Sequence, residues 1–245
     1  LAGIKNILII VNKGQLNQFR RILPEKNHLG LKIQYREQPK PSGLPEAFII
    51  GEKFIGNDNV ALILGDNFFY GQSLTKILKR STNLKTGAKI FLHPVKNPNL
   101  YGVASLDKKK RITALVEKPK KPTSNLAITG LYLFDNSVIK FSKKLKPSKR
   151  NEIEIIDLIK KYKKNKRLKA ELIGRGGTWL DTGNIKDFYD ASNFISTVEN
   201  RQGLKIACIE EISLKNNWIK KKDVREAIKF YGNCDYSKYL RSIIN

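Results

Sequence analysis

The 245-residue sequence contains no methionine and only two cysteines, two histidines and two tryptophans. The two cysteines, Cys208 and Cys234, do not suggest a disulfide framework, and they indicate a reducing compartment. No apolar run reaches the length of a membrane span, and no charged-then-apolar signal peptide opens the chain. We therefore expect a cytoplasmic protein that has no membrane partner.

Acidic residues are also scarce. The chain has 22 Asp and Glu against 47 Lys and Arg, which gives a formal net charge of +25. Such a charge suits nucleic acid, anionic membranes or phosphorylated substrates. The lysines are spread over most of the chain, however, with no interleaving of arginine and aromatic residues and no recognisable nucleic-acid-binding module. A general lysine bias on solvated faces explains this pattern, and we expect no nucleic-acid partner. If the charge instead serves nucleic-acid binding, the protein should bind duplex DNA with an affinity that falls steeply with salt.

The first residues are unusual because no methionine opens the chain. Leu1-Ala2-Gly3 reads like the last turn of a helix with its C-terminal glycine, and an apolar strand pattern follows at once. We therefore expect that the sequence lacks the beginning of its protein.

What the sequence does contain is a globular composition, 40% hydrophobic and 28% charged, in a chain long enough for one large domain. Apolar runs alternate with helical patterns, which predicts an α/β fold with a Rossmann-like, mostly parallel sheet flanked by helices. The run at 60–64 has no polar alternation, as expected of a strand buried on both faces. The expected strands are 6–11, 32–36, 60–64 and 88–95, and the expected helices are 15–23, 44–54 and 74–79.

The pattern changes after residue 95. Two half-buried strand patterns, 101–107 and 111–117, are joined by three lysines and predict a β-hairpin. The remaining expected strands are 127–134 and 168–173, the expected helices are 137–145, 152–164 and 185–199, and the rest is mostly helical.

Five polar segments lie at strand ends, namely 38–43, 65–67, 101–102, 117–118 and 181–183. In open α/β sheets, ligands bind at the carboxyl ends of the strands, and an acid such as Asp66 there suits a metal ligand that faces an anionic substrate. Each segment alone also fits a structural role: a turn at Gly43, a solvated strand end at Glu117, or a helix N-cap region at Asp181. Their joint occurrence favours a site.

In this order the segments resemble the bacterial glucose-1-phosphate thymidylyltransferases, which are sugar-phosphate nucleotidylyltransferases. The resemblance covers essentially the whole chain. The matching stretches are 38–44, 64–71, 101–103, 117–119, 128–132, 150–155, 179–183, 191–195 and 201–205.

The resemblance implies a Mg²⁺-dependent transfer of a thymidylyl group from dTTP to glucose 1-phosphate, giving dTDP-glucose and pyrophosphate. A sugar-phosphate oxygen attacks the α-phosphorus in line, without a covalent enzyme intermediate. Such a reaction mainly needs positioning and charge neutralisation. The family also implies a place in dTDP-rhamnose biosynthesis and a homotetramer.

The resemblance assigns catalysis to Asp66, Lys118 and Asp181. The two carboxylates would hold Mg²⁺, since they would otherwise repel the triphosphate. Gln38 and Gly43 would read the thymine beside Asp66. The residues implied around the sugar phosphate are Asn67, Tyr101, Gly102, Glu117, Lys118 and Thr129. The residues implied for a regulatory nucleotide site are Tyr70, Gly71, Gly174, Arg175, Glu211 and Ile212. The glycines at 174–177 fit a flexible turn without function as well as they fit this regulatory site.

The chain also departs from the family, which begins with a strand and a loop of the form G-G-x-G-T-R-L-x-P, followed by a lysine, that cradles the triphosphate. No segment matches it, so we expect the first strand and the Gly-rich loop to be absent and this chain itself to be weak or inactive. Two alternatives stay open: a related UTP-type enzyme, or a non-catalytic protein that binds sugar phosphate or nucleotide. The expected core is residues 1–200, with a sugar-binding part at about 95–183 that includes the hairpin, and residues 201–245 form a helical appendage of the same domain.

Overall fold

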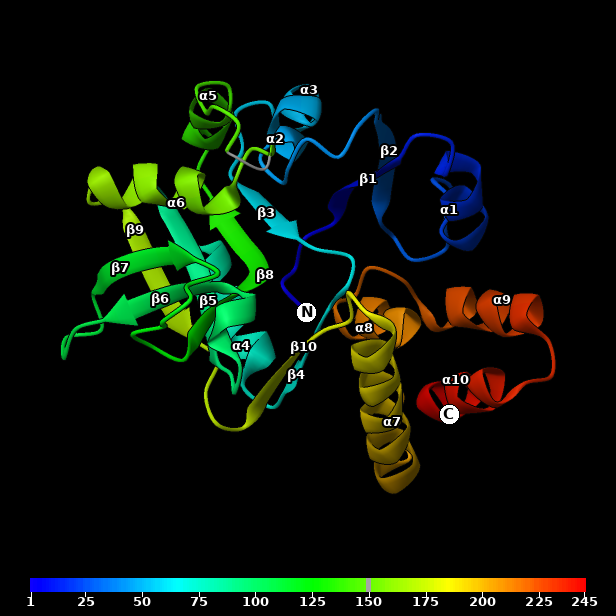
Figure 1. Cartoon of the computed structure of the whole chain (residues 1–245). Coiled ribbons are helices and arrows are strands. Elements are labelled where there is room, and N and C mark those ends of the chain that lie inside the picture. The colour runs from blue at the N-terminus through cyan, green and yellow to red at the C-terminus, as the bar shows by residue number, and fades with distance from the viewer. Residues whose placement is uncertain (149–150) are drawn as a thin grey trace. The chain divides into compact units, whose positions relative to one another are not determined.

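The computed structural model describes residues 1–148 and 151–245, and it confirms the α/β class (Figure 1). Arg150, which belongs to one of the matching stretches, lies outside the described residues. The contacts divide the chain into two compact units. The first, here called the sheet unit, comprises Ala2 and Gln38–Gly183, and the second, here called the helical unit, comprises Leu1, Gly3–Glu37 and Asn184–Asn245. The contacts group residues 3–37 with the C-terminal helices, and the expected division into 1–200 and 201–245 stays a prediction.

The sheet unit is built on a six-stranded sheet whose longest strand is β8 (Leu126–Phe134). One edge of β8 pairs with β5, and β6 and β3 pair with different ends of its other edge. The remaining members extend the sheet outward from β6 and β5. The other strands are β3 (Val60–Ile63), β5 (Ala88–Pro94), β6 (Gly102–Leu106), β7 (Ile112–Glu117) and β9 (Leu168–Leu172).

The direction of β8 changes the expected topology. Strands β3, β5 and β9 all run the same way, as the alternation of strands and helices predicts, and β5 pairs with β9 in parallel. β8 runs in the opposite direction between β3 and β5, so it pairs antiparallel with both. The predicted mostly parallel sheet is therefore a mixed sheet, whereas the predicted β6–β7 hairpin is confirmed.

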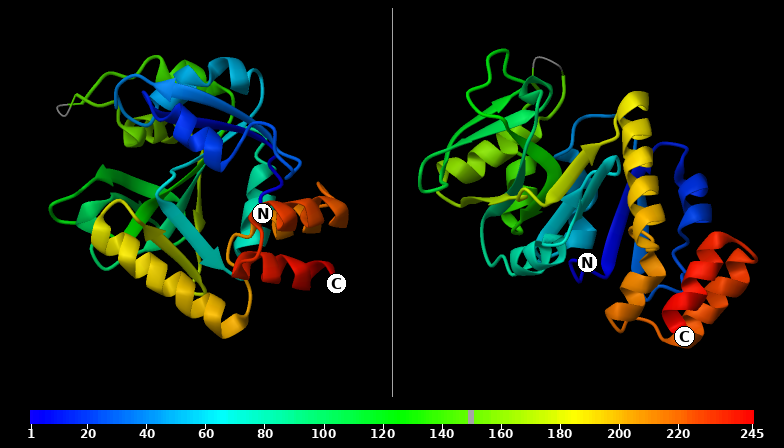
Figure 2. Two further views of the ribbon diagram at one scale, coloured as in Figure 1. Left: turned by 90° about the vertical axis from the view of Figure 1, so that its right-hand side faces the viewer. Right: turned by 90° about the horizontal axis from the view of Figure 1, so that it is seen from below.

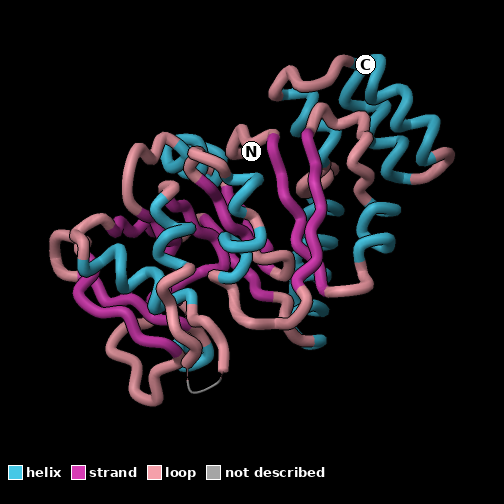
Figure 3. The backbone as a smooth tube through the Cα atoms, turned by 90° about the horizontal axis from the view of Figure 1, so that it is seen from above, coloured by secondary structure: helices cyan, strands magenta, loops and turns pink. Residues whose placement is uncertain are grey.

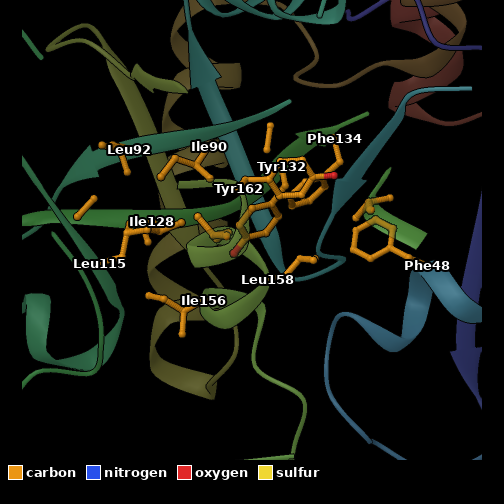
Figure 4. Close-up of a cluster of buried hydrophobic side chains, with 14 of the residues drawn as sticks. Phe48, Ile90, Leu92, Leu115, Ile128, Tyr132, Phe134, Ile156, Leu158 and Tyr162 are labelled. Carbon is orange, nitrogen blue, oxygen red and sulfur yellow. The ribbon is translucent and has the colours of Figure 1, made fainter. Parts of the chain in front are cut away.

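Both faces of this sheet are covered by helices. One core packs β5 and β8 against α2, α5 and α6, with Phe48, Phe134 and Tyr162 among its fully buried side chains (Figure 4). The opposite face packs against α4, with Phe91 and Leu133 in the second core. The helices of this unit are α2 (Glu46–Ile50), α3 (Glu52–Ile55), α4 (Leu74–Thr82), η1 (Pro98–Leu100), α5 (Ser137–Ser142) and α6 (Ile155–Lys164).

The strand β3 is less buried than its sequence predicts. Its residues are half-buried or exposed, and the Ile63 side chain is 57% exposed. Among the described residues, the pairings of β3 involve only its β8 edge. The absence of polar alternation therefore correctly predicted a strand but overestimated how far it is buried.

Two short strands were not predicted. β4 (Asn67–Gly71) and β10 (Gly177–Asp181) pair antiparallel (Figure 2). Their register places Asp181 opposite Asn67 and Trp179 opposite Phe69. Gly71 has a φ of 152°, and a Cβ atom there would lie 2.8 Å from the Cα of Gly177, so only glycine allows this close pairing.

The helical unit contains a two-stranded sheet and five helices among its described residues (Figure 3). A buried carboxylate, Glu210, accepts hydrogen bonds from His28 at 3.2 Å and from the Tyr231 hydroxyl at 2.9 Å, and it also accepts one from Tyr236. The strands and helices of the helical unit are β1 (Asn6–Asn12), α1 (Leu16–Ile22), β2 (Lys32–Gln38), α7 (Ile185–Gln202), α8 (Ile209–Lys215), α9 (Lys221–Tyr231) and α10 (Asp235–Ile244). In the part of the chain that the structure describes, no helix has the length and apolar character to cross a membrane.

Candidate functional site

A pocket of about 220 Å³ lies within the sheet unit, on the side of β8 that faces α6. Its walls come from the ends of β3 and β7, from β6 and β8, from α6 and from the β4–β10 pair. Five of the six residues predicted to surround the sugar phosphate line it together, and the predicted metal ligand Asp181 lines it as well. The five are Asn67, Tyr101, Gly102, Glu117 and Lys118.

The β6–β7 hairpin positions the charged wall of this pocket. Its register places Glu117 opposite Gly102, and a Cβ atom on Gly102 would lie 3.1 Å from Glu117 Oε2. The glycine therefore leaves room for the carboxylate. Lys118 follows directly, and its backbone N–H donates to the Tyr101 carbonyl at 3.0 Å. Lys118 has a φ of 41°, a left-handed conformation that costs a lysine about 1–2 kcal/mol. Such outliers cluster at binding sites.

Asp66 and Asp181 converge because β4 and β10 pair. Both the backbone N–H and the hydroxyl of Thr182 donate to the Asp66 carbonyl at 2.8 Å. A Cβ atom placed on Gly183 would lie 3.1 Å from Asp181 Oδ1 and 3.6 Å from Asp66 Oδ2, so the two carboxylates flank one point. One oxygen of each is held by the protein: Asp181 Oδ1 accepts from Gly183 N–H, and Asp66 Oδ1 accepts from the Asn67 side chain.

This donor set fits Mg²⁺. Among the described residues there is no group of three or more His, Cys, Asp or Glu side chains that could cage a metal ion. Mg²⁺ does not require one, since it is usually held by one or two carboxylates together with substrate phosphates and water. Binding of Mg²⁺ at Asp66 and Asp181 stays a prediction.

The Asn67 side chain lies between the carboxylates and β8. Its Oδ1 accepts from Gly130 N–H at 2.9 Å and from the Trp179 indole N–H at 2.6 Å, and its Nδ2 donates to Asp66 Oδ1 at 2.8 Å. A Cβ atom on Gly130 would lie 2.5 Å from Asn67 Oδ1. Glycine at 130 is therefore required for this arrangement.

Thr129 does not join the pocket. Its side chain is fully buried and donates to the Phe91 carbonyl at 3.1 Å. Side chains alternate along a strand, so Thr129 faces the core beneath α4, and its neighbours Ile128 and Gly130 line the pocket instead. The Thr129 side chain therefore does not line the pocket, and a contact of Thr129 with the sugar stays a prediction.

Several pocket residues were missed by the sequence reasoning. Tyr132 and Trp179 both line the pocket, and burial together with the nearby Glu117 charge raises the pKa of Tyr132. The signal was present: 128, 130 and 132 alternate along one face of β8, and Trp179 precedes Asp181 by two residues on β10. The other missed residues are Leu44, Leu64, Leu100, Ile128, Gly130, Ile155, Ile156 and Ile159.

The predicted thymine-reading residues lie outside the pocket lining. Gln38 Nε2 donates to Glu46 Oε2 at 2.5 Å. Gly43 has a φ of 110°, and a Cβ atom there would lie 2.2 Å from the Ile153 carbonyl oxygen, so its close packing alone requires glycine. Leu44, the next residue, does line the pocket. The nucleotide-binding roles of Gln38 and Gly43 stay predictions.

The predicted regulatory residues are divided between the two units. Tyr70 and Gly71 end β4, opposite Thr178 and Gly177, and Gly174 and Arg175 lie in the loop before β10. Glu211 and Ile212 belong to α8 of the helical unit, where Glu211 accepts hydrogen bonds from Tyr239 at 2.6 Å and from Lys215 at 2.5 Å. A shared site for these six residues stays a prediction.

Known proteins are similar to this chain in sequence and in fold. The nucleotidyl transferase family model matches residues 1–198. Proteins named glucose-1-phosphate thymidylyltransferase from Neisseria meningitidis and Mycobacterium tuberculosis H37Rv are 44% and 40% identical over 244 residues, which is 100% of this chain and 85% and 84% of theirs.

Two solved structures add to this likeness. One is a Bacillus anthracis protein described as a candidate glucose-1-phosphate thymidylyltransferase, in complex with sucrose. It is 35% identical, with a TM-score of 0.71, and the match covers 78% of this chain and 76% of that chain. A UDP-glucose pyrophosphorylase complexed with UDP-glucose is 25% identical, with a TM-score of 0.68 over 80% and 82% of the two chains. The chain therefore belongs to the nucleotidyl transferase family and, within it, to the glucose-1-phosphate thymidylyltransferases.

Proposed function

We propose that the protein transfers a thymidylyl group from dTTP to glucose 1-phosphate and releases pyrophosphate. The observation that supports this most is the pocket in which Glu117, Lys118 and Tyr101 converge beside the Asp66–Asp181 pair. A sugar phosphate needs both hydroxyl acceptors and a cation, and this pocket offers them within two consecutive residues.

The sugar would lie against Glu117, whose carboxylate is a strong acceptor for hydroxyl groups. Apolar side chains of β8 and α6, such as Ile128 and Ile156, also line the pocket and exclude water. Lys118 would meet the phosphate, and an ammonium about 4 Å from a phosphate charge contributes about 4 kcal/mol of attraction at the dielectric typical of a protein surface. Glucose 1-phosphate is thereby held with its phosphate oriented for attack.

Asp66 and Asp181 would hold Mg²⁺, which supplies neutralisation of the triphosphate and polarisation of its α-phosphoryl group. An oxygen of the sugar phosphate then attacks the α-phosphorus, and the bond to pyrophosphate breaks. No side chain forms a covalent bond in this step, so the protein contributes orientation and charge.

Calorimetric titration of glucose 1-phosphate into the protein tests the proposal independently of turnover. We expect binding that Lys118→Ala weakens strongly, and no comparable binding of glucose without its phosphate. Equal binding of glucose and glucose 1-phosphate would contradict the assignment of the pocket. Pyrophosphate release from dTTP, Mg²⁺ and glucose 1-phosphate then measures the reaction itself, which we expect to be weak in this chain because no segment matches the Gly-rich loop.

A UTP-type transfer is the second candidate, because the UDP-glucose pyrophosphorylase neighbour was crystallised with UDP-glucose. Competition between dTTP and UTP in the pyrophosphate assay separates the two. Sugar-phosphate binding with no detectable pyrophosphate release from either nucleotide, even at high protein concentration and long incubation, would favour the non-catalytic alternative.

We further propose that the protein works as a homotetramer in the cytoplasm, within dTDP-rhamnose biosynthesis. The named relatives support this proposal through the family alone. Light scattering after gel filtration measures the assembly.

A further inference from the structure

The orientation of the Asn67 amide is determined by its neighbours. A side-chain amide can turn over, which exchanges its oxygen and its NH₂ group. Two groups that can only donate, the Gly130 backbone N–H and the Trp179 indole N–H, both point at the same end of this amide. That end must therefore be the oxygen, so the NH₂ group has to face Asp66.

Trp179 is itself held firmly. It is 6% exposed, and its backbone lies opposite Phe69 in the β4–β10 pair. Its ring meets the Tyr101 ring edge-on at a centroid distance of 5.1 Å and the His93 ring at 6.4 Å. Burial and these two ring neighbours therefore restrict the direction of the indole N–H.

We propose that Trp179 is a positioning residue whose indole N–H fixes the Asn67 amide, so that this amide orients the Asp66 carboxylate. The NH₂ group engages Asp66 Oδ1, while Oδ2 lies on the side of Gly183 and Asp181. The indole thus acts on Asp66 through one intervening side chain. The inference rests on the proposed function, because it assumes that Asp66 faces the metal–nucleotide substrate.

The physical reason is that residues hydrogen-bonded to metal ligands set their direction. Loss of such a partner typically costs about 10–100-fold in metal affinity or activity. Without the indole N–H, Gly130 alone would hold the Asn67 oxygen, and the amide could rotate away from Asp66. The carboxylate would then sample orientations that do not converge with Asp181.

The test must separate the hydrogen bond of Trp179 from its packing. Trp179 also belongs to a hydrophobic core, with Phe91 and Leu133, so its loss changes packing as well as hydrogen bonding. Trp179→Phe keeps an aromatic ring and removes the N–H. The matched control is Trp218→Phe, which removes the chain's other tryptophan from the helical unit.

The test measures Mn²⁺ affinity by electron paramagnetic resonance in the presence of dTDP-glucose, together with thermal unfolding. We expect Trp179→Phe to lower Mn²⁺ affinity about tenfold or more, and Trp218→Phe to leave it unchanged. Equal Mn²⁺ affinity in the two variants would overturn the inference while leaving the proposed function intact. Failure of the unaltered protein to bind Mn²⁺ with dTDP-glucose would overturn both.

A second variant covers the case in which Trp179→Phe does not fold. In the Trp218→Phe background, tryptophan can be replaced biosynthetically by 3-benzothienylalanine, which has nearly the same shape but carries sulfur in place of the N–H. The Mn²⁺ affinity should fall as in Trp179→Phe, although packing is preserved. In ¹⁵N spectra, the Asn67 side-chain NH₂ signals should shift in both variants and not in Trp218→Phe. Unchanged NH₂ signals and affinity would show that the indole N–H is dispensable.

Discussion

Glu117 and Lys118 are consecutive residues that line the same pocket. Consecutive side chains of a regular strand point to opposite faces, so a continued β7 would direct one of them away. The left-handed φ of 41° at Lys118 ends the strand and brings both charges to one wall. The local strain therefore accounts for an acceptor for hydroxyls and a cation for phosphate side by side.

Two substitutions separate strain from charge at this position. Lys118→Gly and Lys118→Ala both remove the ammonium group, so both should weaken glucose 1-phosphate binding by about tenfold or more. Glycine adopts a positive φ freely, whereas alanine does not. Relief of this strain stabilises Lys118→Gly, and the larger entropy of glycine in the unfolded chain offsets part of the gain. Lys118→Gly should therefore be about 0.5–1 kcal/mol more stable than Lys118→Ala in urea unfolding. Equal stabilities would mean that the backbone at 118 is unstrained in solution.

Gly130→Ala tests the support of Asn67. The new Cβ would lie 2.5 Å from Asn67 Oδ1, so the amide must move and the protein should lose about 1–3 kcal/mol of stability. Glucose 1-phosphate and Mn²⁺ affinity, measured by titration, should both fall. Gly176→Ala is the control, because nothing lies within 4 Å of a Cβ there and its φ is not positive. Wild-type affinity in Gly130→Ala would show that Asn67 does not need its present position.

Glu210 predicts an acid-sensitive helical unit. Burial opposes its ionisation, but hydrogen bonds from Tyr236, His28 and Tyr231 outweigh burial, and the pKa of Glu210 falls below its ordinary value of 4.5. Because the pKa of Glu210 is lower in the folded state than in the unfolded state, its ionisation stabilises the fold. This stabilisation is complete above pH 4.5 and is lost as the pH falls below that value. Glu210→Gln should cost about 1–3 kcal/mol at neutral pH and should flatten the acid limb of stability against pH. Parallel acid limbs in the two proteins would contradict this.

The two cysteines should differ in reactivity. Burial raises the pKa of Cys208, whereas hydrogen bonding with the Ser237 side chain and backbone lowers the pKa of Cys234. Thiolate is the reactive form, so Cys234 should be alkylated first and Cys208 only slowly. Peptide mapping after brief iodoacetamide treatment measures the order. Faster labelling of Cys208 would indicate that its region opens readily.

Local patterns predicted much of the fold because they depend on residues near in sequence. The hairpin of β6 and β7, the strand β8 and the helix α6 all follow from apolar spacing. The direction of β8 could not be predicted this way, because it depends on which strands it pairs with after long connections. The same applies to β4 and β10, whose polar ends indicated loops but which pair across more than a hundred residues.

In the candidate site, too, the sequence predicted some residues and not others. The resemblance supplied Asn67, Tyr101, Gly102, Glu117 and Lys118, and the pocket brings them together. It placed Thr129 at the sugar, whereas the alternation of β8 turns that side chain into the opposite core. The contribution of Trp179 depends on a hydrogen bond to a residue 112 positions away, which no local pattern reveals.

The division of the chain into two units has an optical consequence. Trp179 belongs to the sheet unit and Trp218 to the helical unit, and the sequence has no other tryptophan. Each unit therefore contains its own intrinsic fluorophore. Single-tryptophan proteins made by Trp179→Phe or Trp218→Phe would report the unfolding of one unit each, so that two emission curves reveal whether the halves of this molecule melt as one cooperative body or separately.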